Sequence, residues 1–212
     1  MMKIITPYFV IETPINGNDI LSSIERAGRT AYKSENKITS NSAKEFVKMI
    51  NSKGHFSVIE HQFVTVRVIC DRGISHEIVR HRLASYTQES TRYCNYSKGK
   101  FGNEITVIKP CFWEENDEKY LIWQEVLLQS EKAYNKLIDL GASPQEARGV
   151  LPNSLKTEIV MTMNLREWKH FFKLRTSESA HPQMRQIAIP LLKQFQKQVP
   201  IIFDDIIIAN DL

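Results

Sequence analysis

Residues 80–93 concentrate side chains that bind anions and planar polar groups. The stretch RHRLASYTQESTRY contains three arginines, one histidine, two serines and two tyrosines. A packed core does not tolerate so many polar groups without partners. Arginine suits a phosphate or an imide edge, because its permanently charged guanidinium donates two parallel hydrogen bonds. The residue types therefore favour binding of an anionic, planar ligand, and a solvated basic loop is the alternative.

The spacing in this stretch resembles the signature of the flavin-dependent thymidylate synthases. The matching residues are Arg80, His81, Arg82, Ser85, Ser90 and Arg92. The chain departs from the family pattern at two positions: many members have Asn where this chain has Thr87, and some have Glu where it has Gln88. Both residues keep hydrogen-bonding groups. The family methylates carbon 5 of the uracil in deoxyuridine monophosphate (dUMP) to give dTMP. It takes the one-carbon unit from 5,10-methylenetetrahydrofolate and the hydride from FAD, which NADPH reduces.

Three shorter motifs extend the resemblance from about His55 to Met184. In the family, a His-x-Ser/Thr pair contacts flavin, an Ala-Arg-x-x-Leu-Pro stretch provides an arginine to the nucleotide of a neighbouring subunit, and an Asn-x-Arg pair precedes a further arginine that binds uracil. The corresponding residues here are His55 and Ser57; Ala147, Arg148, Leu151 and Pro152; and Asn164, Arg166, His170 and Arg175.

The resemblance implies a role for each of these side chains. Arg175 is the expected catalytic residue, because an arginine beside the uracil imide favours loss of the proton on nitrogen 3 and makes carbon 5 electron-rich. The expected flavin-binding residues are His55, Ser57, Arg80, His81, Arg82, Gln88, Asn164, Arg166 and His170. The expected nucleotide-binding residues are Glu77, Arg80, Gln88, Glu89, Ser90, Arg92, Arg148 and Arg175. A site shared between chains requires an oligomer, and the family forms homotetramers.

The spacing argues against two other kinds of catalytic site. His76-Glu77 followed by His81 looks like an H-E-x-x-H zinc motif, but the two histidines are five residues apart, about 140° around a helix, so we expect no metal. Cys111 follows a proline, as the nucleophile of the unrelated thymidylate synthases does. It has no neighbouring His or Arg to lower its pKa, so we expect it to pack instead.

Two alternative functions stay open at this stage. One is a nucleic-acid-binding module, with arginines on phosphates and tyrosines stacked on bases. Its residues would be Arg80, Arg82, Arg92, Tyr86, Tyr93 and Tyr96. A net charge of only +4 and the lack of a second basic stripe argue against a nucleic-acid partner. The other is a flavoprotein that oxidises NADPH without transferring a methyl group.

Composition indicates one cytoplasmic domain. A chain of 212 residues with 42% apolar content can bury a sizeable core. Its three scattered cysteines suggest neither a disulfide framework nor a zinc site. No apolar run reaches the ~18 residues of a membrane span, and no signal peptide is evident. We therefore expect a single α/β (α+β) domain over residues 1–212, with a mixed or antiparallel sheet flanked by helices, and no membrane partner.

Hydrophobic periodicity predicts the elements that position the site. Strands are expected over residues 3–12, 62–70, 105–109 and 157–163, with a final edge strand or subunit contact from Ile201. The first expected helix follows Asn16 and has Ile20, Ile24, Ala27 and Ala31 on one face. A helix from Ile74 to Leu83 is expected to have Arg80 and His81 in its last turns. The other helices are expected to begin at Ser40, to span about 117–140, to follow Ser143, to follow Asn164 and to begin at His181. Residues 85–93 are expected to form a polar loop.

Overall fold

The computed structural model describes residues 2–102 and 104–208, and their contacts group into two units. Unit 1 contains the chain up to Tyr8, Val68–Arg80 and Thr87–Ile159. Unit 2 contains Phe9–Arg67, His81–Tyr86 and the chain from Val160 onward. The expectation of a single domain over residues 1–212 stays a prediction. Within the described part of the chain, no helix combines the length and apolarity needed to cross a bilayer.

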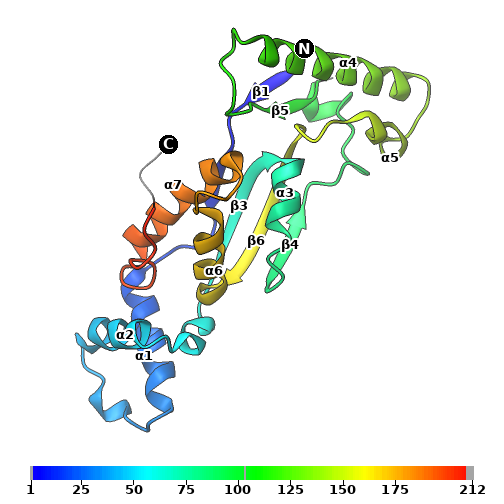
Figure 1. Ribbon diagram of the computed structural model, residues 1–212. Coiled ribbons are helices and arrows are strands. Elements are labelled where there is room, and N and C mark those ends of the chain that lie inside the picture. Colours follow the sequence, from blue (N-terminus) through cyan, green and yellow to red (C-terminus); the bar gives the residue numbers. More distant parts are fainter. Residues whose placement is uncertain (1, 103, 209–212) are drawn as a thin grey trace. The chain divides into compact units, whose positions relative to one another are not determined.

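The strands form a mixed arrangement. Strands β1 (Lys3–Ile5) and β5 (Thr106–Ile108) pair in parallel. Strands β2 (Tyr8–Ile11), β3 (Phe63–Asp71), β6 (Lys156–Asn164) and β4 (Ala84–Gln88) form a second sheet in that order. The arrows of the neighbouring strands β3 and β6 point in opposite directions in Figure 1. Helices flank these strands, so the predicted mixed α/β fold class is confirmed.

In unit 1, the long helix α4 (Glu118–Asp139) packs on the β1–β5 pair. Its Tyr134 and Leu127 are buried with Tyr96, Val107 and Leu155. The unit also contains α3 (Arg72–Ile78), α5 (Pro144–Ala147) and the 3₁₀ turns η3 (Gly99–Phe101) and η4 (Arg148–Val150). The helices predicted over residues 117–140 and after Ser143 are both confirmed, and a capping box between Ser143 and Glu146 opens α5.

In unit 2, α1 (Gly17–Thr30) packs against α2 (Ser42–Ser52), as Figure 1 shows. The 3₁₀ turns η1 (Glu35–Lys37) and η2 (Phe56–His61) follow these helices. The helices approach closely at Gly28, where an added Cβ would lie 2.7 Å from the Phe46 ring. The buried residues of α1 are Leu21, Ile24, Glu25 and Gly28. Of the predicted face, Ile24 is buried, Ile20 and Ala27 are partly buried, and Ala31 is exposed.

Helices α6 (Leu165–Arg175) and α7 (Pro182–Gln198) form the other packed pair of unit 2. The rings of their core lie with centroids 5.0–5.7 Å apart, in the packing expected of aromatic clusters, and belong to Trp168, Phe171, Phe172, Phe195 and Phe203. The helices predicted after Asn164 and from His181 are both confirmed.

Lys169 of α6 joins this core to the end of the described chain. Its side chain is buried, and its Nζ donates to the Ile202 carbonyl, to the Asp205 carboxylate and to Asn51 Oδ1. Residues 201–205 form turns around these contacts and residues 206–208 form no strand, so the predicted edge strand from Ile201 is wrong, while the alternative of a subunit contact stays a prediction. The buried ammonium needs carbonyl and carboxylate oxygens around it, and turns provide them.

The predicted end of the helix before the arginine-rich stretch is also wrong. Helix α3 ends at Ile78, so Arg80 and His81 lie beyond it. Val79 and Leu83, which suggested a longer apolar face, are 38% and 73% exposed. They bury too little apolar surface to extend the helix.

The polar loop predicted over residues 85–93 begins as a strand. β4 spans Ala84–Gln88, and turns follow only from Ser90. Alternate side chains of β4 are partly buried against the sheet, and hydrogen bonding to β6 outweighs the local polarity.

Cys111 is exposed, so the expectation that it packs is wrong.

Candidate functional site

His81 lies at the centre of a buried polar group in unit 2. Its ring is only 3% exposed. Its Nε2 accepts a hydrogen bond from Arg175 Nε at 3.0 Å, and its Nδ1 lies 3.3 Å from Glu167 Oε1. An arginine Nε always carries hydrogen, so Nε2 must be the unprotonated nitrogen. The imidazole is therefore neutral, with its hydrogen on Nδ1 donated to Glu167.

The surroundings of His81 favour this neutral form. Burial, with smaller contributions from Arg175 and His170, lowers the pKa of His81 to about 4. Burial also raises the pKa of Glu167, against the opposing effect of His170. Tyr86 donates to the His81 carbonyl at 2.7 Å, and the Phe171 ring lies edge-on at 4.9 Å. These contacts fix both the backbone and the ring of His81.

Helix α6 brings the partners of His81 onto one face. Glu167, Phe171 and Arg175 recur at intervals of four residues, which align along a helix. The Asn164 side chain caps the helix by accepting from the Glu167 backbone N–H at 2.8 Å. Because this cap fixes where α6 begins, it also fixes the position of Glu167.

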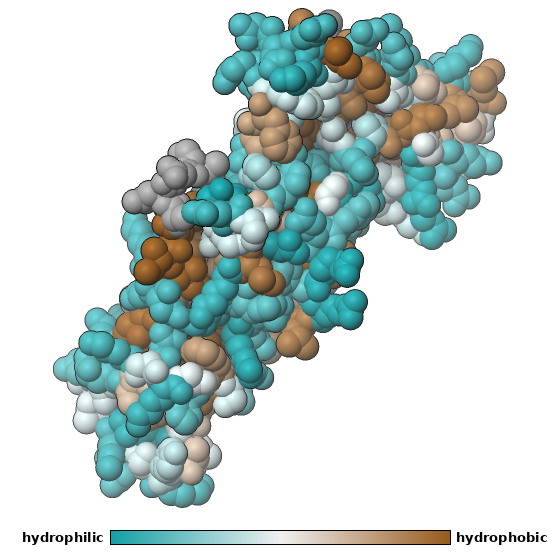
Figure 2. Space-filling model, viewed as in Figure 1, coloured by the Kyte–Doolittle hydropathy of each residue, from teal (hydrophilic) through white to brown (hydrophobic). Residues whose placement is uncertain are grey.

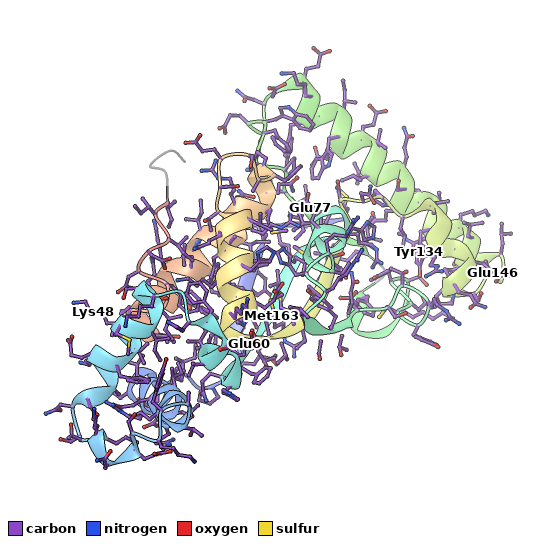
Figure 3. The ribbon with its side chains drawn as sticks, turned by 60° about the horizontal axis from the view of Figure 1, so that its bottom comes forward. Lys48, Glu60, Glu77, Tyr134, Glu146 and Met163 are labelled. Carbon is purple, nitrogen blue, oxygen red and sulfur yellow. The ribbon has the colours of Figure 1, made fainter. Side chains whose placement is uncertain are left out.

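Other residues predicted to bind flavin are exposed in unit 2. Arg166 forms an ion pair with Glu60 at 2.5 Å, and Figure 3 shows Glu60 beside the start of α6. Arg82 and His170 are also exposed, as are His55 and Ser57 at the start of η2. The structure thus gives unit 2 seven of the predicted flavin-binding residues: His55, Ser57, His81, Arg82, Asn164, Arg166 and His170. The other two, Arg80 and Gln88, belong to unit 1.

In unit 1, Gln88 takes part in the framework of the sheet. Its Nε2 donates to Ser75 Oγ at 2.9 Å and to Thr157 Oγ1 at 3.1 Å, which connects the end of β4 to α3 and β6. Glu77 is also on α3, as Figure 3 shows, and is partly buried, whereas Arg80 is exposed. The amide at position 88 therefore has a structural role beside any contact with ligand.

Glu89 is also held by hydrogen bonds. It accepts from Tyr96 Oη at 2.9 Å and from Lys156 Nζ at 2.6 Å. These three side chains line part of a hollow of about 210 Å³. The carboxylate is therefore oriented before any ligand arrives.

The remaining nucleotide-binding candidates meet at the turn after β4. Ser90 Oγ accepts from the Arg92 backbone N–H at 3.3 Å, and the Arg92 guanidinium lies 5.4 Å from the centre of the Tyr93 ring. An Arg148 guanidinium nitrogen lies 3.4 Å from Thr91 Oγ1 of the same chain. Sequence reasoning assigned Arg148 to a neighbouring subunit, and that role stays a prediction. Within one chain, two arginines and a serine hydroxyl gather at this turn, a combination suited to phosphate.

The tyrosines do not favour the nucleic-acid alternative. Tyr96 is 4% exposed and donates to Glu89, and Tyr86 is partly buried and donates to His81. Only Tyr93, which is 78% exposed, is available among these three to stack on a base.

Sequence reasoning missed Glu167. It is separated from His81 by 86 positions, and nothing local connects the two. The available signal was its i, i+8 spacing from Arg175.

Atoms of His81, Glu167 and His170 that can bind metals lie within 4.8 Å of one another, but both His81 nitrogens already take part in the contacts above. The expectation of no metal stays a prediction.

Comparison with known proteins identifies the family. Residues 15–201 match the family model described as thymidylate synthase complementing protein. The chain belongs to this family. A relative from Pyrococcus furiosus, named flavin-dependent thymidylate synthase, is 36% identical over 172 residues, which cover 81% of this chain and 70% of the relative. A relative of the same name from Geobacter sulfurreducens is 33% identical over 191 residues, covering 87% and 81%. The family predicted from the arginine-rich motif is thus confirmed.

A solved structure supports the fold of this family member. PolB from Streptomyces cacaoi, a UMP/dUMP methylase solved with 5-Br dUMP, superposes with a TM-score of 0.77 and covers 96% of both chains. The two sequences are 21% identical. At this level of identity the likeness concerns the fold.

Proposed function

We propose that the protein is a cytoplasmic flavin-dependent thymidylate synthase. It converts dUMP to dTMP with 5,10-methylenetetrahydrofolate as carbon donor and FAD, reduced by NADPH, as hydride carrier. The observation that carries the proposal is the contact between Arg175 and His81. The arginine expected beside the uracil is held in place by the central histidine of the family motif. The names of the relatives support the same activity.

The donor groups of unit 2 fit a flavin. FAD has a charged pyrophosphate and a ring whose edge donates and accepts hydrogen bonds. Arg82 and Arg166 present exposed guanidinium groups for the pyrophosphate, and His170 presents an exposed imidazole for polar atoms. The further residues proposed to hold FAD are His55, Ser57, Arg80, His81, Gln88 and Asn164. When bound, the flavin supplies the hydride.

The turn after β4 fits the nucleotide. Arg92 and Ser90 would hold the phosphate, because they combine permanent charge with a neutral donor at one turn, and Arg148 of another copy would add a second guanidinium. Glu77, Gln88 and Glu89 would hold the sugar and base, together with Arg80. None of these side chains has to act as a nucleophile.

Arg175 would act on the uracil ring. A guanidinium beside the imide stabilises negative charge after nitrogen 3 loses its proton, and that charge increases the electron density at carbon 5. Carbon 5 is the atom that must form the new carbon–carbon bond. The protein therefore contributes orientation and electrostatics.

The surface of α4 supports the proposed homotetramer. Leu121, Ile122 and Val126 are 52%, 56% and 53% exposed, and Figure 2 shows apolar surface along this helix. Apolar side chains gathered on one helix face typically pack against a partner. Another copy of the chain would provide Arg148 to the site.

Product analysis tests the proposed activity. Protein, FAD, NADPH, methylenetetrahydrofolate and dUMP are incubated without oxygen, and the nucleotide is analysed by mass spectrometry. We expect the nucleotide to gain one methyl group, and we expect no gain when FAD is omitted. Consumption of NADPH without a methylated nucleotide would contradict the proposal and favour an NADPH-oxidising flavoprotein.

A further inference from the structure

We propose that Glu167 is a positioning residue that sets the tautomer of His81 and thereby holds Arg175 for its work on the substrate. The catalytic meaning of this inference rests on the proposed function. The tautomer itself is a property of the resting protein and can be measured without turnover. Glu167 is therefore assigned a role through His81 and Arg175, with no contact to the substrate.

The geometry forms one directional chain of hydrogen bonds. Arg175 Nε donates to His81 Nε2 at 3.0 Å, and His81 Nδ1 donates to Glu167 Oε1 at 3.3 Å. His81 and Glu167 are only 3% and 6% exposed, so water competes weakly for either nitrogen. The direction of each bond follows from the arginine, which can only donate.

The acceptor on Glu167 favours the same tautomer of His81 that the N–H of Arg175 requires. A neutral imidazole has one hydrogen, and the bond made by one nitrogen determines the role of the other. Without an acceptor at Nδ1, the hydrogen is free to move to Nε2, where it would face the N–H of Arg175. Two donors cannot bond to each other, so Arg175 would lose its hydrogen bond to His81.

None of the other polar groups named around His81 accepts the hydrogen on its Nδ1 in place of Glu167. His170 and Arg175 face it from α6, and the Tyr86 hydroxyl from β4 donates to its carbonyl. The His81–His170 ring centroids are 5.6 Å apart, and His170 is exposed. Among these groups Glu167 alone is a carboxylate, and its Oε1 is the atom that Nδ1 contacts.

Nuclear magnetic resonance of protein with ¹⁵N-labelled histidine tests the assignment directly. The ring shifts distinguish the two neutral tautomers from the charged form, and His81→Asn identifies the relevant signal. We expect hydrogen on Nδ1 in the unaltered protein. Hydrogen on Nε2, or a charged ring at neutral pH, would overturn the proposal even if no variant folds.

Variants of Glu167 test its influence. Glu167→Met removes the acceptor at similar volume and should move the hydrogen to Nε2. Glu167→Gln retains a carbonyl oxygen and should restore the original tautomer at least in part. Glu178→Ala removes an exposed carboxylate nearby in the sequence and should change nothing. A tautomer that is unaltered in Glu167→Met would refute the role of Glu167.

Calorimetric titration with dUMP tests the link to Arg175. We expect Glu167→Met to weaken dUMP binding about tenfold, and we expect no further weakening when the same change is made in an Arg175→Ala background. Independent, multiplicative losses would show that Glu167 does not act through Arg175. If the tautomer behaves as expected but the enzyme forms no dTMP, the positioning role stands and the proposed function falls.

Discussion

At neutral pH the His81 imidazole is uncharged, because its surroundings lower its pKa from the usual 6.5 to about 4. In the unfolded chain the pKa returns to 6.5, so between pH 6.5 and 4 the unfolded state binds more protons. The free energy of unfolding is therefore greatest above pH 6.5 and falls as the pH is lowered towards 4. The loss is at most about 3 kcal/mol for this residue.

Urea unfolding at pH 7 and pH 5 measures this effect. The raised pKa of Glu167 acts in the opposite sense, because its folded form binds more protons than the unfolded chain. The net loss of stability on acidification should therefore be smaller than the contribution of His81 alone. His81→Asn should reduce the dependence on pH in this range. An unchanged dependence in that variant would mean that other groups cause it.

Arg175 provides the second prediction at the residue scale. Arg175→Ala should lower kcat by about 100-fold or more, because removal of one preorganised electrostatic donor has effects of that size. The purified variant should stay yellow from bound flavin, since the exposed arginines proposed to bind FAD are untouched. Steady-state assays and absorbance spectra check both points. Product formation at the original rate would exclude the assigned role.

At the scale of elements, the close approach of α1 and α2 depends on Gly28. Gly28→Ala places a Cβ 2.7 Å from the Phe46 ring and should destabilise the protein by about 1–3 kcal/mol. Gly149→Ala is the matched control, because an added Cβ there has no atom within 4 Å. Thermal unfolding compares the two. Combining Gly28→Ala with Phe46→Leu should recover part of the loss if crowding is its cause.

The sequence predicted those elements whose signals are local. Asn164 and Ser143 mark helix starts, and the alternation through Val64 and Val66 marks a buried strand, and each was confirmed. It failed where partners distant in the sequence decide. The polarity of residues 85–93 suggested a loop, but pairing with β6 makes part of the stretch a strand.

The candidate site shows the same division. The family motif identified His81 and Arg175, because their types and spacing are recorded in the sequence. Their mutual contact, and the third partner Glu167, depend on how α6 lies against the segment after α3. No spacing rule links residues that are 94 positions apart.

At the scale of the whole molecule, mixing two variants of low activity tests whether sites are shared between chains. Arg148→Ala and Arg175→Ala chains, unfolded and refolded together, should regain partial activity if each site takes the two arginines from different chains. Activity assays after refolding separately and together make the comparison. Failure to recover in mixed oligomers would mean that both arginines come from one chain, as the contact of Arg148 with Thr91 allows.

The buried contacts of Lys169 bear on how the gene can be engineered. A chain that ended before Ile202 would lack the Ile202 carbonyl and the Asp205 carboxylate, so the buried ammonium group of Lys169 on α6 would lose two of its oxygen partners. A buried charge without partners is among the most costly defects a fold can contain. Affinity tags and fluorescent fusions placed beyond Asp205 keep the contacts of Lys169 with Ile202 and Asp205, whereas a variant shortened for easier crystallisation would lose them.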